Sequence, residues 1–519
     1  MSLFRAAATV SSLTLLSRIT GLARDIIIAR TFGASALTDA FWVAFRIPNL
    51  LRRLFAEGAF TQAFVPILAQ VKQTSEDQAA VRLTIDRVAM ALFSVLSLIT
   101  LVGVIGAPLV VLAIASGMGT ADRATEFDAA VWMTRVMFPY IICMSLVSFA
   151  SGVLNTWKRF AIPAVTPVLL NLAMIGSSIW LSGYVSQPIY ALALGVMIGG
   201  VAQLAVQWWA IGRLGLRPRL ANPKQAFTDS TVKRVMRQMV PATLGVSVAQ
   251  ISILINTNIA TWLTPGSVTW LSFADRLMEF PTALIGVALG TVLLPTLSKA
   301  HADQAHDDYS RLLGWGMRLV FVMGLPAALT MIVLADGLVA TLFQYGAFDA
   351  SDVYQTQLAV MAYAVGLLGL LLVKILAPGF YGKQDIKTPV KIAVMVLILT
   401  QLFNLVLVPS LAHAGLALAI GLGACINALA LYIGLRRRNL YQPQPGWLPF
   451  LGKLGLGLTV MAAALIFIAG DLDWTSTELS IWQRAGWLAL SLSGAMASYL
   501  ATLWVLGMRV GDFRRAPQH

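Results

Sequence analysis

Polar and charged side chains stand among apolar residues in three stretches of this sequence that are otherwise apolar enough to lie in a membrane. A charge at the centre of a bilayer costs about 2.5–3.5 kcal/mol, so such a residue normally faces a partner or a water-filled cavity. The set comprises Ser17, Arg18, Arg24 and Asp25 in the first stretch, Asp39, Asn49, Arg52, Arg53 and Glu57 in the second, and Thr269, Asp275, Arg276 and Glu279 in the third. These three stretches are the candidates for chemistry.

Arginine dominates the first two stretches. With Arg30 and Arg46 they hold six arginines, against the three acids Asp25, Asp39 and Glu57. Guanidinium groups offer forked donors that match an anion with several oxygens, such as a phosphate. A proton or sodium pathway would instead call for unpaired carboxylates. The surplus therefore favours an anionic ligand.

Each charge also has a structural explanation. Arg52, Arg53 and Glu57 could lie at the cytoplasmic end of a helix, where long side chains reach the headgroups. Arg24 and Asp25 could neutralise one another, and Asp39 could cap a helix N-terminus. We interpret two isolated cations, Arg135 and Lys374, as structural. Arg18 and Arg276 resist such explanations best, because few local acids can cancel them.

Composition identifies the elements that must position these residues. The chain has 519 residues, of which 58% are apolar and 12% charged, whereas soluble domains average about 25% charged. Mean hydropathy is +0.78. Apolar runs such as Val88 to Ala115 and Ile189 to Ile211 match the roughly 20 helical residues that cross a bilayer. These values exclude a water-soluble protein and predict an all-α polytopic membrane protein with about fourteen transmembrane helices.

Loop charges alternate along the chain and predict the topology. Cations gather in every second loop, for example at Lys158 and Arg159 and at Arg436 to Arg438, while the opposite loops are slightly acidic. By the positive-inside rule the cationic loops are cytoplasmic, and an even number of helices places both termini there. The net charge of +14 is therefore assigned to topology, and no nucleic acid partner is expected.

The sequence contains no arrangement typical of catalysis. Cys143 and Cys425 lie in apolar runs and the four histidines form no cluster, so neither a metal site nor a disulfide is predicted. No nucleophile lies beside a base. We therefore expect a protein that is not an enzyme and needs no cofactor, with a coupling ion, sodium or proton, left open.

Features of the first half recur in the second at nearly one spacing, which indicates internal duplication. Trp42 and Trp270 are 228 residues apart, and Pro66 and Pro295 are 229 apart. Six helices per half give both halves the same orientation, the parallel-repeat plan of secondary transporters. We predict an N-terminal lobe over 1–222, a C-terminal lobe over 223–438 and an appended helix pair over 439–519.

Two segments carry a family resemblance. The sequence SRITGLARDIIIARTFGASALTDAFWVAFRIPNLLRRLFAEGAFTQAFVPILA, from Ser17 to Ala69, and ADRLMEFPTALIGVALGTVLLPTLSK, from Ala274 to Lys299, closely resemble the MurJ (MviN) family of bacterial lipid II flippases. The resemblance implies the fold of the multidrug/oligosaccharidyl-lipid/polysaccharide exporters, with two six-helix lobes around a central cationic cavity. It also implies that the terminal pair forms a groove for a lipid tail.

The same resemblance implies which residues act. Binding would fall to Arg18, Arg24, Arg52, Arg276 and Asp39, with support from Ser17, Asp25, Asn49, Arg53, Glu57, Thr269, Asp275 and Glu279. Relatives can carry serine in place of Thr269, which keeps the hydroxyl.

The implied function is flipping of lipid II, the undecaprenyl-diphosphate-linked peptidoglycan precursor, from the cytoplasmic to the periplasmic face of the inner membrane by alternating access. Expected partners are lipid II and membrane lipids, with cell-wall synthesis proteins as further candidates. Three alternatives remain: a flippase for another polyprenyl-linked saccharide, a cation-coupled drug exporter of the same fold, and a membrane scaffold that transports nothing.

Overall fold

The computed structural model describes residues 3–52, 60–74, 78–219, 221–303, 305–476 and 478–513, and the regular structure in these ranges is helical throughout. The helices that begin before residue 262 are α1 (Leu3–Phe32), α2 (Ala36–Leu51), α3 (Phe60–Thr74), α4 (Gln78–Ile105), α5 (Ala107–Ile114), α6 (Ala124–Met137), α7 (Tyr140–Thr156), α8 (Ala161–Gly176), α9 (Tyr190–Arg213), α10 (Pro223–Thr228) and α11 (Ser230–Thr261). The later helices are α12 (Ser267–Ala302), α13 (His306–Val333), α14 (Ala335–Phe343), α15 (Ala350–Leu376), α16 (Pro378–Tyr381), α17 (Lys387–Arg437), α18 (Trp447–Ala469) and α19 (Ile481–Val505).

The predicted polytopic helical fold is confirmed. Among the described residues, nine stretches are long and apolar enough to cross a membrane. One of them, α17, breaks at Ala412, whose φ of 48° and ψ of −129° are not helical, and so provides two crossings. Together with the long charged helices α1, α11 and α12 and the shorter α2 and α3, the described helices allow about fourteen crossings. This count agrees with the prediction of about fourteen.

Helix starts repeat at the spacing that the duplication predicts. Helices α2 and α12 begin at residues 36 and 267, which are 231 apart, and α6 and α15 begin at 124 and 350, which are 226 apart. The short helices α5 and α14 both follow a break in a long helix, and they begin 228 residues apart, at 107 and 335. The two halves therefore repeat one helix order down to this break.

By its internal contacts, the chain divides into two compact units, residues 1–269 and 270–519. Helix α11 belongs to the first unit, where it packs against α3, α4 and α5. This division follows contacts, whereas the predicted lobes follow the repeat. The lobe boundaries at 222/223 and 438/439 therefore stay predictions.

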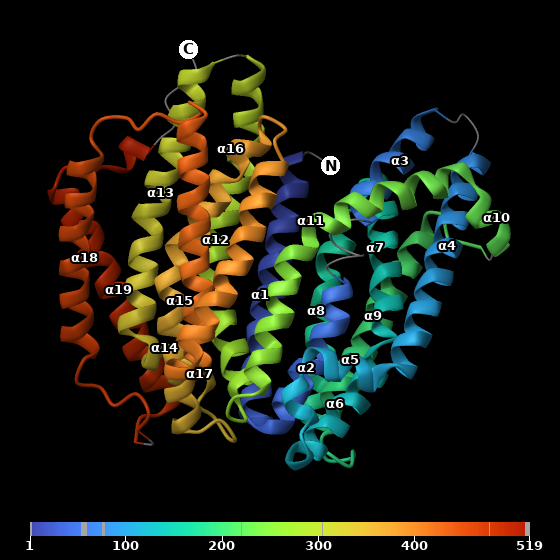
Figure 1. The fold of residues 1–519 in the computed structure, drawn as a ribbon, viewed down its shortest axis with the longest axis horizontal. Helices are drawn as coiled ribbons and strands as arrows, with labels where there is room; N and C mark the ends of the chain where they lie inside the picture. The colour runs from blue at the N-terminus through green and yellow to red at the C-terminus, as the bar shows by residue number, and fades with distance from the viewer. Residues whose placement is uncertain are drawn as a thin grey trace. The chain divides into compact units, whose positions relative to one another are not determined.

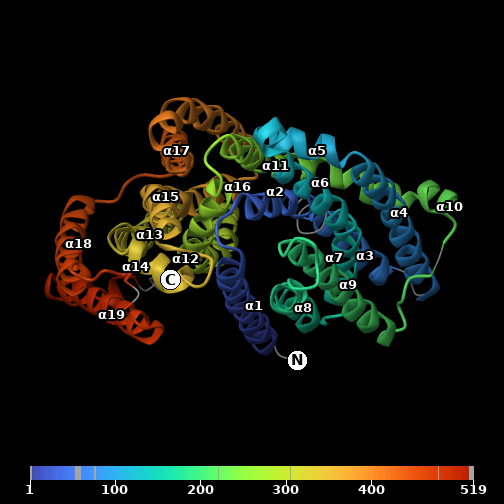
Figure 2. The same cartoon turned by 90° about the horizontal axis from the view of Figure 1, so that it is seen from below.

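Long helices run side by side within each unit (Figures 1 and 2). In the first unit α8 packs between α1 and α9, and α2 packs on α6. In the second, α15 packs closely on α17, and a Cβ built on Gly366 would lie 2.1 Å from Cα of Gly421. Only glycine allows the two backbones to come so near.

The terminal helices α18 and α19 pack on one another, and α18 also lies against α13 (Figure 2). One hydrogen bond ties α19 to α13, and a capping box defines the first turn of α19. The Tyr499 hydroxyl donates to the Val322 carbonyl oxygen at 2.9 Å. At the other end of α19, Ser480 and Gln483 form a reciprocal capping box that determines where the helix starts.

Candidate functional site

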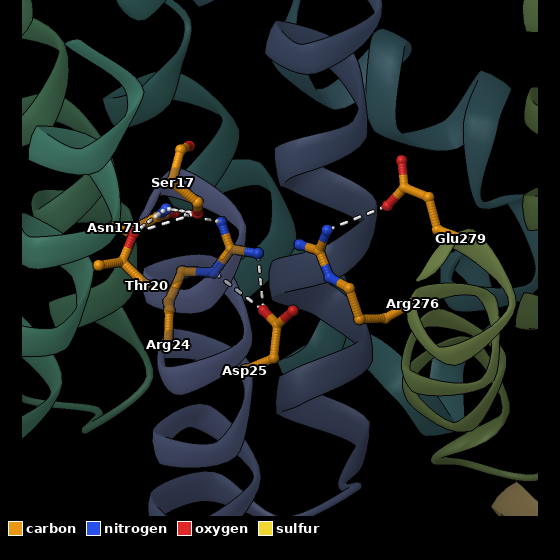
Figure 3. Close-up of polar contacts among 7 residues, drawn as sticks. All are labelled: Ser17, Thr20, Arg24, Asp25, Asn171, Arg276 and Glu279. Atoms are coloured by element: carbon orange, nitrogen blue, oxygen red, sulfur yellow. Dashed lines mark hydrogen bonds and ion pairs between the residues drawn. The ribbon is translucent and has the colours of Figure 1, made fainter. Parts of the chain in front are cut away.

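Arg24 and Asp25 form a buried ion pair on α1 (Figure 3). The Arg24 Nε and Nη2 atoms donate to Asp25 Oδ1 at 2.9 and 2.6 Å. Arg24 is 7% exposed and Asp25 2%. The structure thus brings these two neighbours together as the neutralisation alternative requires, and it fixes the plane of the guanidinium group.

Asn171 holds the same guanidinium from α8, and it was not among the predicted residues. Arg24 Nη1 donates to Asn171 Oδ1 at 3.1 Å, and Asn171 Nδ2 donates to the Ser17 carbonyl oxygen and to Thr20 Oγ1, both at 3.1 Å (Figure 3). Asn171 and Arg24 are both buried, so the bond between them is shielded from water and is stronger than a bond at the surface. The signal in the sequence is an amide inside an apolar helix.

Arg18 is exposed and Ser17 is half-buried. Arg18 and Arg24 are six residues apart, and at about 100° per residue their side chains leave α1 roughly 240° around the axis from each other. Helix α1 therefore presents one arginine to its surroundings and packs the other against α8.

Arg52 is held by Asn49 at the end of α2. Its Nε and Nη2 atoms donate to Asn49 Oδ1 at 3.1 and 2.8 Å, and its side chain is half-buried. Pro48 lies within α2 just before this pair. Arg53 and Glu57 lie outside the described residues, so their predicted roles stay predictions.

Asp39 binds the start of α12. Its Oδ2 atom accepts from the Gly266 N–H at 2.7 Å, and its Oδ1 atom accepts from the Thr269 N–H at 2.8 Å and the Thr269 hydroxyl at 2.6 Å. All three residues are buried. An acid at a helix N-terminus satisfies free N–H groups and complements the helix dipole. Asp39 thus caps α12 and not its own helix, whose N-cap is Ser35.

In the second unit, Arg276 and Glu279 form an ion pair one turn apart on α12. Arg276 Nη1 lies 3.0 Å from Glu279 Oε2, and the two side chains are 35% and 50% exposed (Figure 3). Asp275 is exposed beside them. Because both side chains are exposed, the ion pair contributes little stability, and its charges are accessible to a ligand.

Lys374, interpreted from the sequence as structural, also reaches α12. Its Nζ atom donates to the Thr282 carbonyl oxygen at 2.9 Å, although its side chain remains exposed. A Cβ on Gly286 would lie 2.3 Å from Lys374 Cδ. The glycine therefore leaves the space in which this lysine lies.

The guanidinium group of Arg24 can bind an anion. Arginine carries five N–H donors, and the bonds to Asp25 and Asn171 use three of those of Arg24. Within the described ranges, no group of three or more His, Cys, Asp or Glu side chains could hold a metal ion.

Comparison with known proteins decides the family. A family model described as Lipid II flippase MurJ matches residues 28–479. The chain belongs to the MurJ family. It is 52% identical to the lipid II flippase MurJ of Burkholderia cenocepacia over 516 residues, which cover 99% of both chains. It is 39% identical to the probable lipid II flippase MurJ of Haemophilus influenzae, over 96% of this chain and 98% of that one.

Solved structures agree on the fold. A lipid II flippase MurJ in an inward closed conformation matches with a TM-score of 0.78 at 20% identity, over 96% of this chain and 99% of that one. An inward-facing multidrug resistance MATE family transporter of the MOP superfamily matches with a TM-score of 0.66 at 15% identity, over 83% and 98%. At these identities the matches show fold alone, and they confirm the exporter fold expected for a MurJ chain.

Proposed function

We propose that this chain flips lipid II, moving the undecaprenyl-diphosphate-linked precursor from the cytoplasmic to the periplasmic face of the bacterial inner membrane. The observation that carries the proposal is the match to a lipid II flippase at 52% identity across 99% of both chains. Flipping proceeds by alternating access of the two lobes, 1–222 and 223–438. The chain works as a transporter and not as an enzyme.

The arginines contact the diphosphate. Arg24 has two N–H donors left after its bonds to Asp25 and Asn171, and Arg18 and Arg276 are accessible. Arg52 adds a fourth guanidinium. Neutralising the headgroup lowers the cost of moving it through hydrocarbon. Asp25 and Glu279 balance Arg24 and Arg276 while no substrate is bound.

Asp39 is a positioning residue. It fixes the first turn of α12 through Gly266 and Thr269, and Arg276 follows Thr269 by seven residues, about two turns of the same helix. Loss of the cap would let the start of α12 fray and would move Arg276. Thr269 supplies the hydroxyl that completes this cap.

The remaining parts serve the same function. By the positive-inside rule, the cationic loops support a cytoplasmic location of both termini, and the terminal pair over 439–519 would hold the polyprenyl tail. Membrane potential could drive the step, since each charge that crosses is worth about 2.3 kcal/mol per 100 mV. A coupling ion and cell-wall synthesis partners are compatible with this scheme.

A cation-coupled drug exporter is the second candidate, because MATE transporters share the fold. The arginine surplus argues against it, since cationic drugs call for acidic sites. One depletion experiment separates the two in cells whose only flippase is this chain. A flippase predicts that lipid II accumulates on the cytoplasmic face before growth stops. Unchanged lipid II distribution with heightened drug sensitivity would support the exporter instead.

A further inference from the structure

A groove on the first unit combines an apolar wall with two arginines. It has a volume of about 700 Å³, lies on α9 and the neighbouring α7, and is lined by Leu146, Val201, Trp208, Trp209, Arg213 and Arg217 among others. Its lining, which falls wholly within the described residues, includes no acidic side chain. It contains none of the residues assigned to lipid II.

The two arginines lie at one end of the groove because of how α9 ends. Gly215 has a φ of 70°, and the Leu216 N–H donates to the Ile211 carbonyl oxygen at 3.2 Å. This is a Schellman ending, in which a left-handed glycine turns the chain back against the helix. Arg217 is thereby returned to the same groove as Arg213.

An aromatic platform holds one of these cations. The Arg213 guanidinium lies 4.3 Å from the centre of the Trp209 ring, within the range of a cation–π contact. Trp209 is 56% exposed, so the platform faces the surroundings of the helix. Indole and arginine side chains together are typical of a membrane–water interface.

The length of the groove along α9 is close to the thickness of one leaflet. Val201 and Arg213 are twelve residues apart on α9, which is about 18 Å along the helix axis. Half of a hydrocarbon core is about 15 Å. A lipid with its phosphate at Arg213 and Arg217 would therefore lay its acyl chains along the apolar wall toward Val201.

We propose that this groove is a binding site for an anionic glycerophospholipid of the leaflet in which α9 ends, the cytoplasmic leaflet in the orientation proposed above. The two arginines bind the phosphate, and the apolar wall binds the chains. Basic pockets between transmembrane helices on this side of a membrane bind anionic headgroups in the same manner. Bulk lipid would need only the apolar wall, whereas two cations in a groove whose lining includes no acid select for a negatively charged headgroup.

Native mass spectrometry of the full chain, delipidated in detergent and titrated with dioleoyl phosphatidylglycerol or dioleoyl phosphatidylcholine, tests the site. Wild type should prefer phosphatidylglycerol. Arg213→Gln with Arg217→Gln should weaken phosphatidylglycerol binding about thirtyfold, five- to sixfold for each arginine, and leave phosphatidylcholine unchanged. Binding is measured without flipping, so the result is independent of the proposed function.

A matched control removes the same charge elsewhere. Arg436 and Arg437 are both exposed at the end of α17, and Arg436→Gln with Arg437→Gln should keep the preference for phosphatidylglycerol. A second variant covers the case in which the Gln pair in the groove folds poorly. Arg213→Lys with Arg217→Lys conserves the charge and should also keep the preference. Unchanged binding in the Gln pair, or an equal loss in the α17 control, would overturn the proposal. Displacement of the lipid by millimolar inorganic phosphate would do the same, because it would show a free-phosphate site.

Discussion

Removing the acid that caps α12 should destabilise the protein in graded steps. Asp39 accepts three hydrogen bonds, from the Gly266 N–H and from the N–H and hydroxyl of Thr269, at 2.6–2.8 Å. Hydrogen bonds to a charged group contribute about 1.5–3 kcal/mol each, and an unsatisfied buried donor costs about 1–3 kcal/mol. These values set the size of each step.

Thr269→Ala removes one bond and should cost about 1.5–2 kcal/mol, whereas Thr269→Ser keeps the hydroxyl and should cost well under 1 kcal/mol. Asp39→Asn replaces one of the two carboxylate oxygens by an amide NH₂ group. Whichever oxygen is replaced, the NH₂ donor then faces an N–H or O–H donor. Its cost should be about 3–5 kcal/mol. Asp39→Ala should cost at least as much.

The assay is the apparent unfolding temperature of purified protein in detergent, where each kcal/mol corresponds to about 2–4 °C for a unit of roughly this size. Asp122→Asn, an exposed acid of the first unit, is the control and should leave the temperature within 1–2 °C of wild type. The reasoning is refuted if Asp39→Asn matches the control, or if Thr269→Ser is as damaging as Thr269→Ala.

Three further predictions concern other parts of the chain. Asn171→Leu should lower the free energy of unfolding by about 2–4 kcal/mol, because it removes the three hydrogen bonds of a buried side chain, one of them to Arg24; chemical denaturation checks this, and a neutral result would show that Asn171 does not stabilise the contact between α1 and α8. Gly366→Ala should destabilise the α15–α17 contact by roughly 1–3 kcal/mol, while Gly455→Ala, with no atom near its Cβ, should be neutral or slightly stabilising; equal unfolding temperatures would contradict the close-packing argument. Hydrogen bonds from Thr388 and the Arg438 guanidinium lower the pKa of Asp385 to about 2. The difference in free energy of unfolding between wild type and Asp385→Asn, measured by chemical denaturation, should therefore be constant from pH 8 to 5 and shrink below pH 4, as pH falls from the ordinary carboxyl pKa toward 2. A difference that grows on acidification would contradict this prediction.

Much of the fold could be predicted from the sequence, because hydropathy and charge act locally. The prediction of about fourteen helices, for example, needs the long apolar run of α17 to cross the membrane twice, and the break at Ala412 divides it into two crossings. Only helices and closed barrels satisfy the backbone in lipid. The apolar runs are about 20 residues long and do not alternate as barrel strands do, so helices are predicted. The repeat spacing of about 228 residues recurs in the helix starts, because similar local sequences begin similar helices in both halves.

The partners of the charged residues could not be predicted in this way. Helical periodicity shows that Arg18 and Arg24 leave α1 in different directions, but it does not show that Asn171, 147 residues away, holds Arg24. Asp39 has a plausible local role as a cap, and only the tertiary fold assigns it to α12. Long-range hydrogen bonds depend on which helices become neighbours, and a single sequence does not encode that in its spacing.

The central claim is that the diphosphate of lipid II is bound by arginines, one of them buried and held in place, Arg24, and another accessible, Arg276. The most direct measurement is the amount of lipid II accessible to an external probe in cells whose only flippase is this chain, with Arg24→Lys, Arg24→Gln and Arg276→Gln compared at equal protein levels. Lysine keeps the charge of Arg24 but cannot bond to Asp25 and Asn171 together through a planar fork, so we expect partial flipping with Arg24→Lys and almost none with either glutamine variant. Wild-type amounts of external lipid II in both glutamine variants would contradict the claim.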